Sequence, residues 1–354
     1  GSPQAAAVGR VTREVLRSIG IWEEVKANTL VFKPTVNELA NDLSLGTIDA
    51  TVIWDATASQ YDAVHAVHLD TMNAHARTIA IGVATDAGQS QEALKLARFL
   101  ASRDHGGAFF EAFGYTPIDG DVYADRPSIT LFAGTMFNTA IEESILAFES
   151  REGVDVTRLY NGCGILVSQM RSGATPDAYL ACDQSFLDSI ADRFLPGVEL
   201  SHNPIVIAVA KGNPKNITSL DDLARSGVRI GLAHPEKSAL GSLSASLLRA
   251  EGVATAVENA ATNVHDAPQG DFLINALRVG AIDAALVYIS NTALSRDELD
   301  VIQINSPLAR SRQPFAIATA SPAAQLAARL RDTLTTSISQ KRFEAIGFEW
   351  KATP

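Results

Sequence analysis

The sequence is short of cysteine, has no excess of basic residues and contains no long apolar run, and each shortage excludes a class of protein. Two cysteines rule out a disulfide-dense scaffold and an all-cysteine zinc site. With 29 Lys and Arg against 40 Asp and Glu, the net charge is −11. This acidic balance argues against a nucleic-acid-coating protein. No run approaches the roughly 20 apolar residues of a membrane span, so we expect no membrane insertion.

The composition that remains is that of a folded protein with a substantial core. The chain has 354 residues, of which 46% are hydrophobic and 19% charged, which excludes wholesale disorder. Its length predicts roughly two domains. No secretory signal is present at the N-terminus. Because Gly1-Ser2 is typical of a cloning remnant, removal of a leader stays open.

Three stretches of the first third match stretches of the last third at a nearly constant separation. Such a spacing indicates a repeated module. The separation is 232 to 234 residues, and the pairs are 3–20 with 235–252, 45–54 with 279–288, and 110–115 with 343–348.

The repeat is incomplete, because residues 127–234 have no counterpart nearer the N-terminus. We therefore predict a partial module over residues 1–118, corresponding to a C-terminal half, and a complete domain over 127–350. A polar stretch rich in Gly and Asp, 119–126, is typical of a linker between them.

Within the complete domain, apolar runs of strand length alternate with segments of helical spacing. This order predicts an α/β fold in which helices cover largely parallel strands. Ligands of such sheets bind beyond the carboxyl ends of strands, where helix N-termini offer free N–H groups. The predicted strands are 128–133, 154–160, 178–182, 205–210, 228–232 and 284–289, and the predicted helices are 138–149, 165–170, 184–194, 219–225, 239–251, 271–279, 322–337 and 340–346.

Seven motifs in this domain, taken together in their order, resemble the molybdate- and tungstate-binding periplasmic proteins of ABC transporters. The resemblance implies the type 2 periplasmic-binding-protein fold, with two α/β lobes around a cleft. Lobe one would comprise residues 127–200 and 291–350, and lobe two residues 201–290. The motifs are ITLFAGTMF, YNGCGILVSQM, TPDAYLACD, NPIVIAVAKGNP, HPEKSALG, GAIDAALVY and FEAIGF.

The function implied by this resemblance is that of a receptor, not an enzyme. Members of the family close on a tetrahedral oxyanion, held by neutral hydroxyl and N–H donors. The chain would then be periplasmic or extracytoplasmic and would deliver its ligand to an ABC transporter permease, without a cofactor. No Walker loop, G-x-G-x-x-G or G-x-S-x-G motif suggests catalysis.

The family's contact positions carry over to this chain with two changes. Its two serines fall on Met136, with Thr135 beside it, and on Cys163. Two backbone N–H donors fall on Leu240 and Gly270, and the tyrosine hydroxyl falls on Tyr288. Since both serines are replaced, the resemblance leaves molybdate itself open.

Each of these side chains also has an ordinary structural interpretation. Met136 would pack at a helix start. Thr135 would serve as an N-cap. Tyr288 would be a core residue.

Cys163 and Cys182 leave further alternatives open. The two cysteines could form a disulfide, or could bind a soft metal together with Met136. A sensor or interaction module that has lost its ligand is a third reading.

The partial module is expected to lack an anion site of its own, since Trp54 stands where Tyr288 stands in the complete copy. A lone half-module would expose apolar faces, so we expect it to pack against the complete domain, against another chain through self-association, or against a segment upstream of Gly1.

Overall fold

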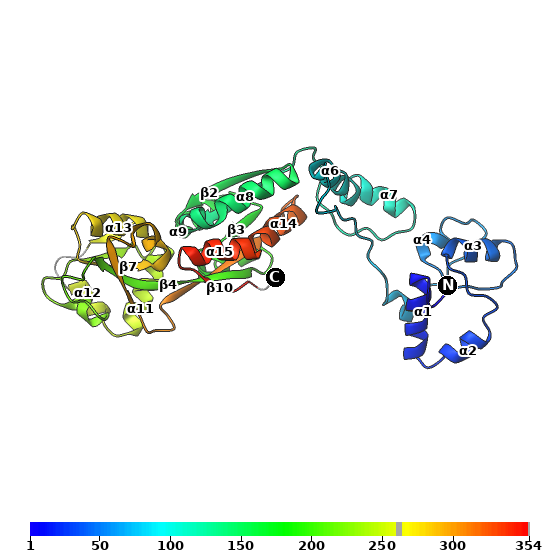
Figure 1. The fold of residues 1–354 in the computed structure, drawn as a ribbon, viewed down its shortest axis with the longest axis horizontal. Coiled ribbons are helices and arrows are strands. Elements are labelled where there is room, and N and C mark those ends of the chain that lie inside the picture. The colour runs from blue at the N-terminus through cyan, green and yellow to red at the C-terminus, as the bar shows by residue number, and fades with distance from the viewer. Residues whose placement is uncertain (260–263, 353–354) are drawn as a thin grey trace. The chain divides into compact units, whose positions relative to one another are not determined.

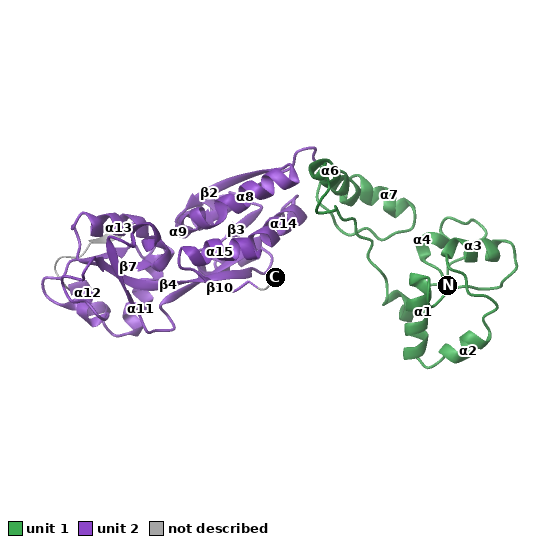
Figure 2. Ribbon diagram, in the orientation of Figure 1, with its two compact units in different colours: residues 1–123 green, residues 124–354 purple. Residues whose placement is uncertain are grey.

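The computed structural model describes residues 1–259 and 264–352, and the chain forms two compact units (Figure 2). Unit 1 is Gly1–Tyr123 and unit 2 is Ala124–Pro354. The division falls inside the stretch 119–126 that the sequence suggests as a linker. Within the described residues, no helix has the length and apolar character needed to cross a bilayer.

Unit 1 consists of helices and irregular segments, and its described residues form no strand. In α1 the residues Val8, Val11 and Val15 recur at helical spacing and are buried. Residues 50–54, which match a strand of the second half, are irregular here. The helices are α1 (Ala7–Ser18), α2 (Trp22–Ala27), α3 (Val36–Ser44), α4 (Asp55–Ala58), α5 (Asp70–Asn73), α6 (Ser90–Ala101) and α7 (Gly106–Ala112).

Lobe one of unit 2 is built on a mixed sheet. Its central strand β1 (Ser128–Gly134) lies parallel between β2 (Asp155–Asn161) and β3 (Ala178–Leu180). Its apolar residues are buried, as expected for a strand covered on both faces. The antiparallel strand β9 (Arg310–Ile317) follows β3. The helices of this lobe are α8 (Asn138–Glu152), α9 (Cys163–Arg171), α10 (Gln184–Asp188), α14 (Ala324–Leu334) and α15 (Ser337–Ala345), and the 3-10 turns are η1 (Thr135–Phe137) and η2 (Ala191–Arg193).

One long strand, β4 (Val198–Ala210), belongs to both lobes (Figure 1). Its first part pairs with β9 and with β10 (Glu349–Trp350), and its second part pairs with the strands of lobe two. The sheet order is β2-β1-β3-β9-β4-β7-β5-β6. Lobe two contains β5 (Ile230–Ala233), β6 (Val264–Ala267), β7 (Ala284–Tyr288) and β8 (Leu299–Gln303), with α11 (Ala239–Ala250), α12 (Ala254–Asn259), α13 (Gly270–Arg278), η3 (Asp221–Ala224) and η4 (Ile289–Ser295).

Lobe one resumes later along the chain than the sequence suggests. We expected its second segment to begin at Asn291, but β8 still pairs with β4 in the lobe-two sheet. Leu299 and Ala309 are buried in the lobe-two core. The return to lobe one therefore comes with β9.

Two predicted helices are also shorter than expected. The segment 184–194 splits into α10 and the 3-10 turn η2. Over 219–225 only the 3-10 turn η3 forms. The carboxylate of Asp222 accepts the N–H groups of Thr218 and Ser219 instead of standing inside a regular helix.

Candidate functional site

A cavity of about 40 Å³ lies between the lobes of unit 2, and every predicted contact residue lines it. One water needs roughly 10–15 Å³ measured in the same way, so the cavity suits a ligand of a few heavy atoms. Lobe one contributes Thr135, Met136, Asn161, Gly162, Cys163 and Cys182, and the lobe-two side contributes Ser238, Ala239, Leu240, Gln269, Gly270, Asp271, Tyr288 and Asn291.

Tyr288 ends β7 and provides a buried donor without a partner. The residue is 4% exposed, and its hydroxyl makes no hydrogen bond to a described residue. Ser311 is a hydrogen-bonding neighbour of this hydroxyl, but the Ser311 proton goes to the carbonyl of Asn203, and Ser311 also accepts from Gln313. Burial, together with the charge of Asp183, raises the pKa of Tyr288 far above its ordinary value. The hydroxyl therefore stays protonated and can donate to a ligand.

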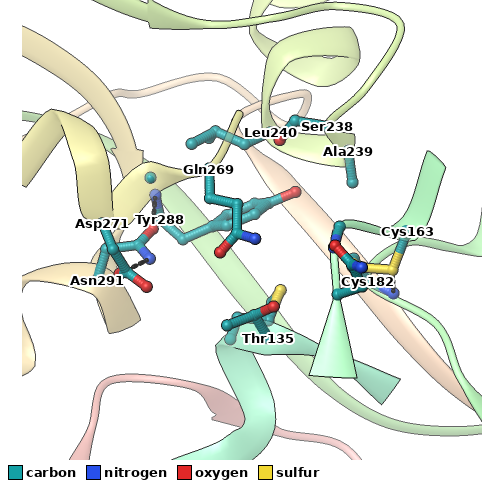
Figure 3. Close-up of a pocket in the computed structure, with 14 residues that line it drawn as sticks. Thr135, Cys163, Cys182, Ser238, Ala239, Leu240, Gln269, Asp271, Tyr288 and Asn291 are labelled. Atoms are coloured by element: carbon teal, nitrogen blue, oxygen red, sulfur yellow. Dashed lines mark hydrogen bonds between the residues drawn. A yellow bond between two sulfur atoms is a disulfide. The ribbon is translucent and has the colours of Figure 1, made fainter. Parts of the chain in front are cut away.

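Figure 3 shows the Tyr288 ring in the middle of the cavity, with the hydroxyl pointing toward the Cys163 and Cys182 side. Because this hydroxyl lines the cavity, its hydrogen-bonding capacity is open to a small ligand.

The starts of two helices face the same cavity from lobe two. Ser238 precedes α11 and Gln269 precedes α13, and neither side chain makes a capping hydrogen bond. The first N–H groups of each helix, including that of Leu240, are thus left without a capping side chain. Uncapped N–H groups at a helix N-terminus favour an anion through hydrogen bonds and the helix dipole.

Close packing around a glycine fixes both helix starts. A Cβ added to Gly241 would lie 2.3 Å from the carbonyl oxygen of His234, so α11 approaches the end of β5 as only glycine allows. A Cβ added to Gly270 would lie 2.4 Å from Oδ1 of Asn291. The same Asn291 oxygen accepts a hydrogen bond from the N–H of Tyr288 at 3.1 Å. The Asn291 Nδ2 donates to Oδ1 of Asp271 at 2.9 Å.

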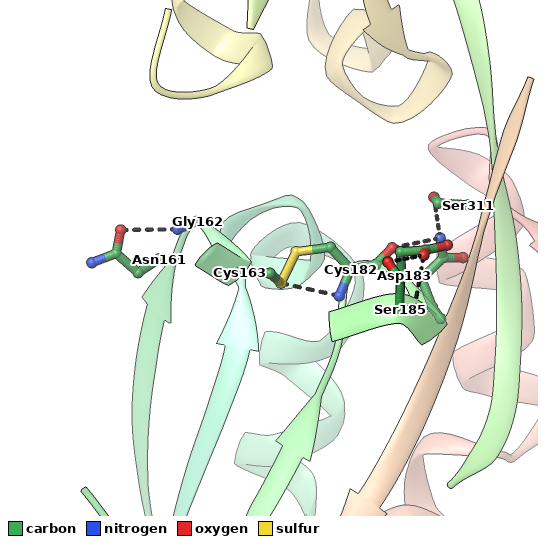
Figure 4. The surroundings of a disulfide bond; sticks show 8 residues. Asn161, Gly162, Cys163, Cys182, Asp183, Ser185 and Ser311 are labelled. Carbon is green, nitrogen blue, oxygen red and sulfur yellow. Dashed lines mark hydrogen bonds between the residues drawn. A yellow bond between two sulfur atoms is a disulfide. The ribbon is translucent and has the colours of Figure 1, made fainter. Parts of the chain in front are cut away.

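The lobe-one wall carries a disulfide between Cys163, which begins α9, and Cys182, which follows β3 (Figure 4). Both cysteines are buried, and their Cα atoms are 6.1 Å apart. Two N–H groups of this wall already have acceptors. Cys182 N–H donates to Cys163 Sγ at 3.0 Å, and Gly162 N–H donates to Oδ1 of Asn161 at 2.9 Å.

The end of β1 lies against the same disulfide. A Cβ added to Gly134 would be 2.4 Å from Cys182 Sγ and 3.3 Å from Cys163 Sγ. Only a glycine leaves room for the main chain beside the two sulfur atoms. Gly134 therefore allows Thr135 and Met136, which follow it, to lie at the cavity.

The disulfide overturns the soft-metal alternative. That reading needs thiolates at Cys163 and Cys182, whereas the two sulfur atoms are bonded to each other. The described residues also contain no cluster of His, Cys, Asp and Glu that could hold a metal ion.

The two lobes touch beside the cavity. A Cβ added to Gly164 would lie 2.8 Å from the carbonyl oxygen of Glu236, and one added to Gly162 would lie 3.1 Å from that of Lys237. The loop before α11 thus lies directly against the start of α9. Met136 packs against the cores of both lobes, so it has a packing role as well as a place in the cavity.

The cavity contains no positive side chain among its described lining residues, and one carboxylate, Asp271, stands at its edge. Donors here are neutral hydroxyl, amide and N–H groups. The sequence did not suggest Ser238, Gln269, Asn161, Asp271 or Asn291. Ser238 and Gln269 could have been found from their positions, because each directly precedes one of the two helices whose N–H groups, at Leu240 and Gly270, are predicted donors.

The fold and the cavity together define a two-lobed α/β protein with a site for a small solute between its lobes. A family profile described as bacterial extracellular solute-binding protein matches residues 1–116 and 129–349. The chain belongs to this family. The fold expected from the sequence is confirmed, and so is the resemblance to solute-binding proteins, which are not enzymes.

Curated relatives are similar to part of the chain. The molybdate-binding protein ModA of Mycobacterium tuberculosis is 31% identical over 173 residues, which are 46% of this chain and 62% of the relative. ModA of Escherichia coli is 24% identical over 128 residues, 34% of this chain and 50% of the relative. The chain thus matches less than two thirds of the length of these relatives.

Solved structures show the same fold. The periplasmic molybdate-binding protein of Azotobacter vinelandii superposes with a TM-score of 0.55 at 15% identity, covering 63% of this chain and 100% of that one. The sulfate-binding protein SubI of M. tuberculosis gives a TM-score of 0.54 at 19% identity, with coverages of 63% and 86%.

Proposed function

We propose that unit 2 binds a small tetrahedral oxyanion, with molybdate or tungstate preferred and sulfate-like anions next. The observation that carries this proposal is the buried, unpartnered hydroxyl of Tyr288 beside two uncapped helix starts. An oxyanion offers acceptors in several directions at once, which matches donors converging from different elements.

Neutral donors suffice for such a ligand. Charge-assisted hydrogen bonds to an anion are shorter and stronger than neutral ones, and helix dipoles add to them in a site that excludes water. The donors come from Tyr288, the Ser238–Leu240 turn and Gln269, with Thr135 supplying a hydroxyl from the opposite lobe. The cavity volume of about 40 Å³ supports a small anion over a large organic ligand.

In this account the receptor works outside the cytoplasm and delivers its anion to an ABC transporter permease. Support comes from the molybdate-binding relatives and from the Cys163–Cys182 disulfide, because disulfides persist mainly in oxidising compartments. A ligand-free module on the same fold is not favoured, because the relatives that this chain resembles are ligand-binding proteins.

Thermal unfolding with about 1 mM molybdate, tungstate, sulfate or phosphate tests the proposal. A site of micromolar affinity should add about 4 kcal/mol of stability at this concentration. We expect the largest rise in melting temperature with molybdate or tungstate. The absence of any shift with all four anions would refute the proposal.

A further inference from the structure

Two strands at the junction of the lobes, β4 and β9, carry a set of buried polar side chains. Ser201 and Asn203 lie in β4, and Ser311 and Gln313 lie in β9. All four residues are 0% exposed. Burying a polar side chain costs free energy unless it is hydrogen-bonded, so the partners of these residues decide what the set can do.

The strand register places Ser311 and Tyr288 on one face of the sheet. Ser311 is the Cα partner of Asn203 across the β4–β9 pair. Tyr288 is the partner of Ile205, two residues beyond Asn203 in β4. Paired residues, and residues two apart along a strand, point to the same face. Ser311 is accordingly a hydrogen-bonding neighbour of the Tyr288 hydroxyl, although it is not among the described residues that line the cavity.

The hydrogen bonds of Gln313 have a fixed direction. Its Oε1 accepts from the hydroxyl of Ser201 at 3.0 Å, and its Nε2 donates to the carbonyl oxygen of Cys182 at 3.2 Å and to the hydroxyl oxygen of Ser311. The carbonyl oxygen of Cys182 can only accept, so the amide nitrogen must lie on this side. Ser311 is therefore an acceptor toward Gln313, and its own proton is left for another partner.

The Ser311 proton makes a long hydrogen bond and has a second acceptor beside it. The bond goes to the carbonyl oxygen of Asn203 at 3.4 Å, whereas O–H···O bonds usually measure about 2.7–2.8 Å. The second acceptor is the oxygen of the Tyr288 hydroxyl, which has no partner among the described residues. A hydroxyl proton rotates to suit its partners, so rotation of the Ser311 O–H group can exchange one acceptor for the other.

We propose that Ser311 is a positioning residue of the anion site, which acts through Tyr288 without touching the ligand. When the Tyr288 hydroxyl donates to an anion, Ser311 donates to the Tyr288 oxygen, and a chain of donors then runs from Gln313 to the anion. Hydrogen bonds in such a chain polarise and strengthen one another in a buried site. The inference rests on the proposed function, since it requires an anion that accepts from Tyr288.

A double-mutant cycle in the full chain tests the inference. Calorimetry gives the molybdate affinity of the unmodified protein, of Ser311→Ala, of Tyr288→Phe and of the two changes combined, and the melting temperature of each is recorded. Ser339→Ala is the matched control, because Ser339 is also 0% exposed and donates to a main-chain carbonyl, that of Thr333, at 3.0 Å. Ser339 lies in α15 and contacts Ser144 of α8 instead of Tyr288.

We expect Ser311→Ala to weaken molybdate binding about fivefold when Tyr288 is present, and by less than about 1.5-fold in the Tyr288→Phe background. Ser339→Ala should leave the affinity unchanged in both backgrounds, even where it lowers the melting temperature. Equal losses from Ser311→Ala in the two backgrounds, or no loss in either, would overturn the inference.

Ser311→Thr keeps the hydroxyl and covers the case in which Ser311→Ala does not fold. This variant should bind molybdate as tightly as the unmodified protein, and a fivefold loss would show that packing at this position matters instead of the hydroxyl. The two proposals fail in different ways. No molybdate binding by the unmodified protein would refute the proposed function and the inference with it, whereas binding without coupling between Ser311 and Tyr288 would refute the inference alone.

Discussion

The two walls of the cavity differ in what they leave unsatisfied. On the lobe-two wall, the Tyr288 hydroxyl has no partner among the described residues, and the side chains of Ser238 and Gln269 make no capping hydrogen bond. On the lobe-one wall, the N–H groups of Gly162 and Cys182 already bond to Asn161 and to the disulfide.

The difference assigns ligand binding mainly to lobe two and the shape of the cavity mainly to lobe one. Free donors can transfer their hydrogen bonds to a ligand, whereas groups with internal partners contribute mainly geometry. We therefore expect the affinity for an anion to reside mostly in lobe two. Substitutions on the two walls test this assignment.

Removing the Tyr288 hydroxyl should have the largest effect. A hydrogen bond to a charged group contributes about 1.5–3 kcal/mol, so Tyr288→Phe should weaken molybdate binding roughly 10- to 100-fold in calorimetry. Folding should be little affected, since the hydroxyl makes no hydrogen bond of normal geometry to another described residue.

Tyr179→Phe is the matched control, because Tyr179 is also buried with an unpartnered hydroxyl but does not line the cavity. The Tyr179→Phe variant should bind molybdate with the same affinity as the unmodified protein. Equal losses in the two variants would mean that Tyr288 acts only through the fold.

The cap of α11 should come next. Ser238→Ala removes a hydroxyl that makes no capping bond, so a loss of about 1 kcal/mol, or roughly fivefold in affinity, is expected with little change in melting temperature. Ser242→Ala, one turn further along the same helix, should bind normally. A lower melting temperature with unchanged anion affinity would show that Ser238 only caps the helix.

The disulfide should matter more for stability than for binding. Replacing Cys163 and Cys182 by serine releases a link across 19 residues and should lower the free energy of unfolding by about 3 kcal/mol in urea titrations. Affinity should fall only about two- to threefold, because this wall supplies shape rather than free donors. A larger loss of affinity than in Tyr288→Phe would reverse the roles assigned to the walls.

Thr135 should show the smallest effect. Thr135→Val keeps the shape and removes the one hydroxyl that η1 offers from lobe one, and we expect about a twofold loss in affinity by calorimetry. A tenfold loss would show that lobe one holds the anion as firmly as lobe two.

The fold of unit 2 was largely predictable because its strands are continuous apolar runs and its helices have clear periodicity. Segments such as 128–133 and 239–251 became β1 and α11 almost as expected. The strands β8 and β9 were missed, and with them the return to lobe one, because RSRQPFAI mixes charged residues into its first half. Their pairing with β4 depends on tertiary contacts that local patterns do not contain.

The position of the cavity could also be predicted, since strand ends and helix starts in this order converge. What the sequence could not decide was the state of Cys163 and Cys182, because two residues 19 positions apart pair only if the strand ends meet. The free caps were equally hidden. A serine before a helix normally caps it, and only the structure shows that Ser238 does not.

The most direct test of the central claim is anomalous diffraction from crystals grown with tungstate. We expect a single tungsten peak in the cavity. It should be placed so that the anion's oxygen atoms lie about 3 Å from the Tyr288 hydroxyl and from the N–H groups that begin α11. An empty cavity, or a tungsten peak elsewhere on the chain, would contradict it.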